Sequence, residues 1–183
     1  MEKIRVDEII KLNKADLRGK VICFPTDTVY GIGALYDDRE AIEKIFRLKN
    51  RRGDKPIANL CGGIEQIKAL GIEITPLASD LIERFWPGPL TIIFPAGKNK
   101  VAFRMPDCLP ALRLLSRFGP LATTSVNESG EPELNDYEEI ESRFGNDIDY
   151  FISDPWDLLG EPSTVVDLAG GDIVVIREGS IKL

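Results

Sequence analysis

Three segments of this sequence carry polar and charged side chains at spacings that suit ligand binding. The first, FPTDTVYGIG at residues 24–33, follows the apolar run VICF and holds three hydroxyls, one carboxylate and two glycines. A buried strand that ends in a glycine-containing turn often presents hydroxyls and backbone N–H groups to a ligand. The segment matches neither a P-loop nor the GxGxxG fingerprint. Thr26, Asp27 and Thr28 could equally serve to cap the turn, so both interpretations stay open.

The second segment is basic. Lys49 follows Ile42 by seven residues, which places it on the expected inward face of a helix. With Arg51, Arg52 and Lys55 it puts four bases within residues 49–55, a density that favours an anion cradle at the mouth of a cleft. The alternative for Lys49 is that its stem lies along apolar surface while its charge complements the C-terminal end of the helix dipole.

The third segment is LATTSVNESG, in which Ser125 and Asn127 alternate along a strand end and therefore share one face. They either form a turn or offer a hydroxyl and an amide to a ligand. Arg104 closes the apolar run VAFR, and its planar fork suits a carboxylate or a phosphate, although an exposed ion pair is the other option. Ser163 in PSTVVDL and Arg177 in VVIREG present the same choice.

The chain contains no histidine, and this excludes several kinds of chemistry. Ser-His-Asp and Cys-His nucleophiles and histidine-ligated metals all need an imidazole. The three cysteines, Cys23, Cys61 and Cys108, lie far apart and form no CxxC pattern, so we expect reduced thiols. Proton transfer must then rely on carboxylates, lysine, water or the substrate. These features favour reactions run by positioning and charge neutralisation.

Charge is unevenly distributed along this acidic chain, whose formal net charge is -7. Residues 128–161 contain twelve acids and one base, whereas residues 39–55 contain seven bases and three acids. One local basic site suits a small anionic ligand better than a long nucleic acid, which needs a broad basic face. We interpret the acidic stretch as a solvated face.

The elements that position these residues follow from hydrophobic periodicity. Apolar positions recur at helical spacing in residues 4–17, and helices are predicted at 39–49, 64–70, 76–86 and 110–117. We expect Asp37 or Asp38 to cap the helix at 39–49 and Thr75 to cap the helix at 76–86. Strands are predicted at 21–24, 56–61, 90–94, 101–104, 121–126, 150–153, 163–168 and 172–177, and a surface loop at 127–136. Strands interleaved with helices, and closely spaced late strands, predict an α/β fold with a mixed sheet.

Length and apolar content set outer bounds. A chain of 183 residues can bury one substantial core, so we expect a single domain over 1–183. No segment approaches the roughly 20 apolar residues that cross a bilayer, and the N-terminal stretch is amphipathic. We therefore expect a soluble, cytoplasmic protein without membrane partners.

The order of these segments resembles one family, the YrdC/TsaC family of L-threonylcarbamoyladenylate synthases. FPTDTVYGIG is similar to its PT[DE]TxYG segment, LKNRRGDKP to its KxR segment, and FWPGPLT is shared almost letter for letter. VAFRMP, TSVNESG, PSTVVDL and VIREGSI follow in family order, so the resemblance covers the chain from about residue 20 to its end.

The resemblance implies a twisted mixed sheet with flanking helices and a basic concave cavity. It also implies the formation of threonylcarbamoyl-AMP and pyrophosphate from L-threonine, bicarbonate or CO2, and ATP with Mg2+, for modification of tRNA by a downstream threonylcarbamoyl transferase complex. Carried over by motif, Lys49 and Arg51 would be catalytic. Threonine would contact Thr28, Arg104, Thr123 and Ser163, and ATP would contact Arg51, Lys55, Ser125, Asn127 and Arg177; no residue is predicted to bind a metal.

Two other functions are weighed against this one. The first is an RNA-binding module of the same fold, with weak binding of tRNA in a basic cavity, although the acidic balance and the lack of an aromatic platform oppose it. The second is a paralogue with a different or lost adenylate-forming activity, because a fold does not fix a function. The KxR residues, Lys49 and Arg51, and the SxN residues, Ser125 and Asn127, are all present, which opposes a loss of activity.

Overall fold

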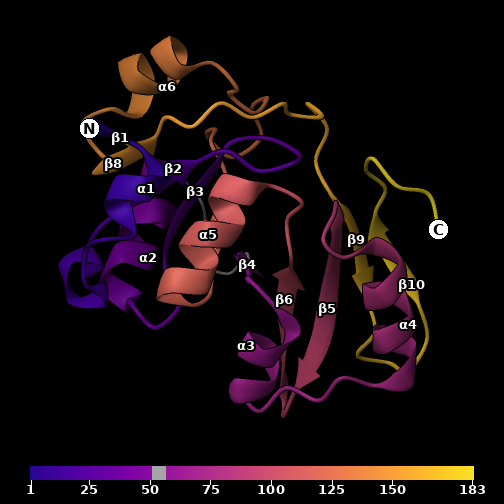
Figure 1. Ribbon diagram of the computed structural model, residues 1–183. Coiled ribbons are helices and arrows are strands. Elements are labelled where there is room, and N and C mark those ends of the chain that lie inside the picture. The colour runs from indigo at the N-terminus through magenta and orange to yellow at the C-terminus, as the bar shows by residue number, and fades with distance from the viewer. Residues whose placement is uncertain (51–56) are drawn as a thin grey trace.

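The structure, a computed structural model, describes residues 1–50 and 57–183 (Figure 1). The strands of these residues form one sheet in the order β1-β8-β2-β3-β7-β4-β6-β5-β9-β10. They are β1 (Glu2–Ile4), β2 (Ile22–Phe24), β3 (Gly31–Leu35), β4 (Ala58–Leu60), β5 (Leu90–Ala96), β6 (Asn99–Arg104), β7 (Leu121–Ser125), β8 (Tyr150–Ile152), β9 (Thr164–Asp167) and β10 (Val174–Arg177). The pairs β1/β8, β2/β8, β4/β6 and β5/β9 are parallel, and the other neighbours are antiparallel. The mixed sheet predicted from the sequence is confirmed.

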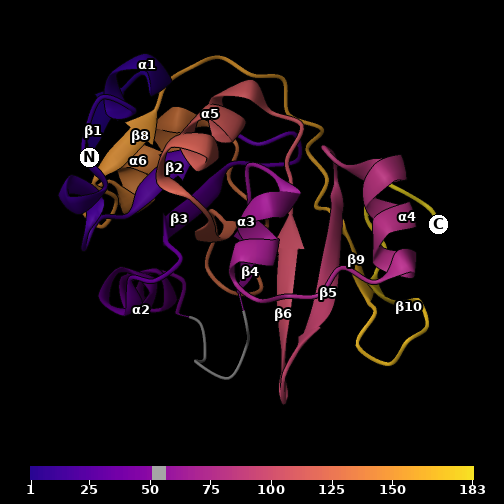
Figure 2. The same ribbon diagram turned by 60° about the horizontal axis from the view of Figure 1, so that its bottom comes forward.

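Helices cover the sheet unevenly. They are α1 (Val6–Ile9), the 3-10 turn η1 (Lys14–Leu17), α2 (Arg39–Leu48), α3 (Ile64–Ala69), α4 (Pro76–Phe85), α5 (Leu109–Phe118) and α6 (Tyr137–Phe144). In the half of the sheet around β2 and β3, α1 and α5 pack in one apolar cluster, and α2 and α6 pack in another. In the half around β5, a third cluster joins the sheet to α3 and α4. The N-terminus lies at the first end of the sheet and the C-terminus at the other (Figures 1 and 2).

Alternation along β5 leaves one face of the second half open. Leu90, Ile92 and Phe94 are buried in the cluster that contains α4 residues. Because successive side chains point to opposite faces, Thr91 and Ile93 face the other way. These two residues line a cavity, so the uncovered face of this half is where a ligand can sit.

Local sequence signals place several helix boundaries. The Asp38 carboxylate accepts a hydrogen bond from the backbone N–H of Ala41 at 3.2 Å and so caps α2. The Thr75 hydroxyl accepts from the N–H of Ala78 at 3.2 Å and caps α4, with Pro76 in the first turn. Both predicted caps are confirmed, and the predicted helices and strands agree with the structure within a few residues at their ends.

Three elements differ from the prediction. The helical spacing in residues 4–17 yields part of β1, the short α1 and the η1 turn, because main-chain pairing with β8 draws Glu2–Ile4 into the sheet. The central strand β3, with sequence GIGAL, was not predicted because its two glycines favoured a turn at this position. Helix α6 was not predicted within the acidic stretch, yet Ile140 and Phe144 bury one face of it against the sheet.

Candidate substrate pocket

A cavity of about 300 Å³ lies on the open face of the sheet, a volume within the range of small-molecule sites. Its wall combines the turn after β2, the ends of β3 and β7, and side chains of β5, β6 and β9. Six residues predicted from the sequence to bind substrate lie together in this wall: Thr28, Arg104, Thr123, Ser125, Ser163 and Arg177. Segments far apart in the chain therefore meet at one hollow.

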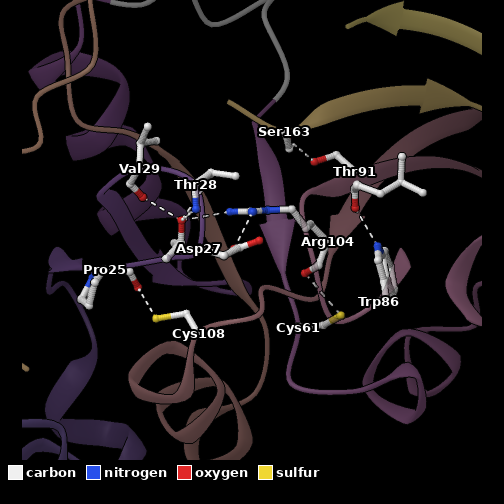
Figure 3. A network of polar contacts seen from close by, with 12 residues as sticks. Pro25, Asp27, Thr28, Val29, Cys61, Trp86, Thr91, Arg104, Cys108 and Ser163 are labelled. Atoms are coloured by element: carbon white, nitrogen blue, oxygen red, sulfur yellow. Dashed lines mark hydrogen bonds and ion pairs between the residues drawn. The ribbon is translucent and has the colours of Figure 1, made fainter. Parts of the chain in front are cut away.

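Arg104 and Asp27 form a buried ion pair at the floor of the cavity (Figure 3). Arg104 Nη1 donates to Asp27 Oδ1 at 2.8 Å, and Nη2 donates to the Thr26 hydroxyl at 3.2 Å. The two side chains are only 7% and 8% exposed. Burial lowers the pKa of the Arg104 guanidinium and the Asp27 carboxylate opposes that change, so Arg104 remains a cation at neutral pH. The surface ion pair considered for Arg104 is thus excluded.

One carboxylate oxygen of Asp27 takes no part in the ion pair with Arg104. Its Oδ2 is buried and has no hydrogen-bond partner among the described residues. Such an atom is costly to bury, and in native proteins it usually marks a functional group or an ordered water. The capping role considered for Asp27 is wrong, because its carboxylate faces Arg104.

Thr26 is the residue that shapes the turn. Its hydroxyl accepts from the N–H of Thr28 at 3.1 Å and lies 2.7 Å from the carbonyl oxygen of Val29, to which it donates. The Thr28 hydroxyl lies 3.0 Å from the Thr26 hydroxyl. The Thr26 hydroxyl therefore holds the turn, and both Thr26 and Thr28 line the cavity, so the segment combines the two interpretations.

Glycines on β3 make room for Thr123. A Cβ at Gly33 would lie 2.9 Å from Thr123 Oγ1 and 3.1 Å from the Phe24 ring. At Gly31 it would lie 2.9 Å from Thr123 Cγ2. The two glycines of the opening motif thus allow β3 to pair with β7 while Thr123 packs across it.

A chain of hydrogen bonds links Thr91, Ser163 and Arg177 in the wall of the cavity. The hydroxyls of Thr91 and Ser163 lie 2.8 Å apart. Arg177 donates to the Ser163 carbonyl oxygen from Nε at 3.1 Å and from Nη2 at 2.7 Å. Burial lowers the pKa of Arg177, and the negative charge of Glu133 opposes that change. Ser163 therefore links the hydroxyl and the guanidinium of this wall.

Lys49 lies behind the cavity wall. Its side chain is buried, and Nζ donates to the carbonyl oxygens of Ser125 at 2.6 Å and Asn127 at 2.8 Å, and to Asn127 Oδ1. The Ser125 hydroxyl donates to the same Asn127 oxygen at 2.9 Å. Three of the predicted KxR and SxN residues therefore meet in one cluster, of which only Ser125 lines the cavity. The expected position of Lys49 at the mouth of a cleft is wrong, because the strand end draws its ammonium group inward.

Three residues of the predicted anion cradle, Arg51, Arg52 and Lys55, lie outside the described residues. Thr91 and Glu133 are among the lining residues that the sequence did not assign to a ligand. The alternation of β5 offered a signal for Thr91, since it must face away from Ile92. Glu133 lies in the predicted surface loop, where no periodicity assigns a direction to a side chain.

The described part of the chain offers neither a metal cluster nor a membrane-spanning helix. No group of three or more Asp, Glu or Cys side chains there could hold a metal ion. No helix there is long and apolar enough to cross a membrane.

Comparison with known families accounts for this arrangement. The model of the Sua5/YciO/YrdC family, described by the words telomere recombination, matches residues 15–179. The chain belongs to this family. The predicted resemblance is confirmed, since the YrdC proteins form one branch of the matched family.

Relatives in the family differ in length. The threonylcarbamoyl-AMP synthase of Pyrococcus abyssi is 36% identical over 90% of this chain, and that of Coxiella burnetii is 31% identical over 86%. The chain matches 90% of the Coxiella protein but only 52% of the Pyrococcus protein and 50% of a Bacillus subtilis synthase that is 35% identical. It thus spans about half the length of these two longer relatives.

Solved structures show the same fold. P. abyssi Sua5 in complex with L-threonine superposes with a TM-score of 0.87 at 32% identity, over 100% of this chain and 57% of that one. E. coli YciO superposes with a TM-score of 0.85 at 25% identity, over 99% and 96% of the two chains. The YrdC-like mixed sheet inferred from the sequence is confirmed by both.

Proposed function

We propose that this chain is a threonylcarbamoyl-AMP synthase, a nucleotidyltransferase that uses L-threonine, bicarbonate or CO2, and MgATP and releases pyrophosphate. The observation that carries the proposal is the single cavity in which Thr28, Arg104, Thr123 and Ser163 meet Ser125 and Arg177. Membership of the family and the names of the relatives support it. The structural relative crystallised with L-threonine supports an amino acid as one substrate.

The amino-acid end of the cavity is suited to a carboxylate. Arg104 uses Nη1 and Nη2 in contacts with Asp27 and Thr26 and still lines the cavity, so a planar fork with further N–H donors can face a ligand. Hydroxyls of Thr28, Thr123 and Ser163 would orient the amino acid. Because Asp27 and Thr26 hold the guanidinium in place, little side-chain freedom is lost when substrate binds.

The nucleotide end would use Ser125 and Arg177, together with Arg51 and Lys55 as predicted from the sequence. Lys49 and Asn127 would act as positioning residues, since their polar groups hold the strand end that carries Ser125. MgATP enters as the substrate complex, and the metal would neutralise phosphate charge when bound.

The reaction needs two anions to be held together more than it needs a strong base. The neutral amine of threonine attacks CO2 and releases a proton to water, and an oxygen of the resulting N-carboxylate attacks the α-phosphorus while pyrophosphate leaves. Arg104 and Arg177, which line the same cavity, would place the two reactants and neutralise charge, which are the main sources of acceleration for such a step. A cytoplasmic transferase complex acting on tRNA would then consume the product.

Incubation with ATP, MgCl2, bicarbonate and each amino acid, followed by mass spectrometry of the adenylate, tests the function. We expect threonylcarbamoyl-AMP and threonine-dependent release of pyrophosphate. Arg51→Ala and Lys49→Ala should abolish that release in protein that remains folded by circular dichroism. Full turnover in both variants, or no adenylate from the unaltered protein, would contradict the proposal.

A further inference from the structure

One carboxylate in the cavity wall is not used by the reaction described above. Among the described residues that line the cavity, the charged side chains are Arg104, Arg177 and Glu133, and Glu133 is the only acid. An acid is unexpected in a cavity that is to receive two anions, because it repels phosphate and carboxylate groups. It therefore calls for a ligand group that donates hydrogen bonds and carries no negative charge.

The position of Glu133 is fixed by its neighbours. The Asn127 side-chain amide donates to the carbonyl oxygen of Glu131 at 2.6 Å, and the N–H of Leu134 donates to the carbonyl oxygen of Val126 at 2.8 Å. The Leu134 side chain is buried in the core. Both sides of Glu133 are thus attached to the strand end of β7, and the side chain between them is directed to the cavity.

Within residues 1–50 and 57–183 the carboxylate of Glu133 has no partner. Glu133 makes no hydrogen bond and no ion pair with any described residue, although its charge acts on the Arg177 guanidinium. It therefore faces Arg177 without closing a salt bridge. A ligand that places a phosphate on Arg177 would present its next group toward Glu133.

In ATP the group next to the α-phosphate is the ribose, which carries two adjacent hydroxyls. A carboxylate offers two acceptor oxygens at a spacing that suits a cis-diol, and acidic side chains bind ribose hydroxyls in other nucleotide sites. Val165, the neighbour of Arg177 across the β9–β10 pair, lines the cavity with Ile57 and Ile93, and these apolar residues offer a surface for an uncharged base. Arg177, Glu133 and this apolar surface therefore offer partners for the phosphate, the ribose and the base within one cavity.

We infer that Glu133 accepts hydrogen bonds from the ribose hydroxyls of the bound nucleotide and makes the cavity selective for ribonucleotides. This inference rests on the proposed function, because it assigns the sugar of the same ATP. It goes beyond that function by naming a specificity-determining residue in a loop that the sequence alone leaves without a role.

Calorimetric titration without threonine tests the inference, since no turnover then occurs. The ligands are ATP, 2′-deoxy-ATP and inosine triphosphate. Each is titrated once in the presence of Mg2+ and once in EDTA without Mg2+. The unaltered protein should prefer ATP over 2′-deoxy-ATP by about ten- to a hundredfold, the value of a hydrogen bond to a charged acceptor. Glu133→Ala should bring that ratio close to one, and Glu133→Gln should leave an intermediate ratio.

The matched control is Glu131→Ala, which removes one negative charge from the same loop. Its carboxylate pairs with Arg143 and does not line the cavity, so the ratio should stay unchanged. A preference that survives Glu133→Ala, or none in the unaltered protein, would overturn the inference. A Glu133→Ala loss that is equal for ATP and 2′-deoxy-ATP but absent for inosine triphosphate would also overturn it, because this pattern marks a contact to the adenine amino group. A loss seen only with Mg2+ would overturn it as well, because it marks a metal ligand. Failure of all three nucleotides to bind would instead refute the proposed function.

Discussion

At the scale of single residues, the buried Asp27–Arg104 pair has the largest expected effect. Removal of one partner leaves an uncompensated charge inside the protein, whereas removal of both does not. Asp27→Ala should therefore lower the free energy of unfolding by about 3–5 kcal/mol. The double variant Asp27→Ala/Arg104→Met should recover most of that loss.

Urea unfolding of the two single variants and the double variant measures this coupling. Additive losses in the double variant would show that the ion pair does not account for the effect. The double variant should also bind no threonine, because it lacks the guanidinium that faces the cavity.

The buried thiols give stability a dependence on pH. Burial raises the pKa of Cys61 to about 12, from an ordinary value of 9.0. Between these values the unfolded chain releases a proton that the folded protein keeps, so stability is full below about pH 9 and falls as pH rises toward 12. Cys61 should contribute at most about 1.4 kcal/mol per pH unit to this decline.

Urea unfolding at pH 8, 9 and 10 checks the dependence, with Cys61→Ala as the comparison. The variant should lose stability less steeply over this interval. Identical slopes for the two proteins would count against a buried, protonated Cys61.

At the scale of elements, strand β3 and its glycines control the position of Thr123. Gly33→Ala should push the Thr123 hydroxyl and the Phe24 ring apart from the strand, because the new Cβ lies at 2.9 and 3.1 Å from them. Overpacking of this kind costs about 1–3 kcal/mol, and we expect threonine affinity to fall as well. Urea unfolding and threonine titration measure the two effects.

Gly170→Ala is the matched control, since a Cβ there meets nothing within 4 Å. It should leave both quantities within error of the unaltered protein. Equal behaviour of the two variants would remove β3 from the account of the threonine site.

At the scale of the whole molecule, charge decides which anions can bind. The net charge of -7 opposes a long polyanion, while Arg104 and Arg177 act within one local cavity. Filter binding of tRNA without ATP should show no retention at roughly 10 µM protein and physiological salt, because non-specific affinity depends on phosphate neutralisation by many bases. Retention with micromolar affinity would favour the RNA-binding alternative.

The sequence by itself determined the mixed α/β architecture, the caps of α2 and α4, and the family. These depend on local chemistry, namely hydrophobic period, capping side chains and ordered motifs, which one chain displays directly. It also named six of the residues that line the cavity. Their motifs marked them as strand ends with unusual polar content.

Tertiary structure alone decided how those residues act. Asp27 is a counter-charge and not a cap because Arg104 arrives from β6, and Lys49 is buried because β7 ends above it. Strand β3 pairs despite its glycines because its neighbours supply the side chains that fill the space. Glu133 faces the cavity because the segment around it is bonded to the end of β7. Each outcome depends on contacts between segments far apart in the chain, and local periodicity carries no information about such contacts.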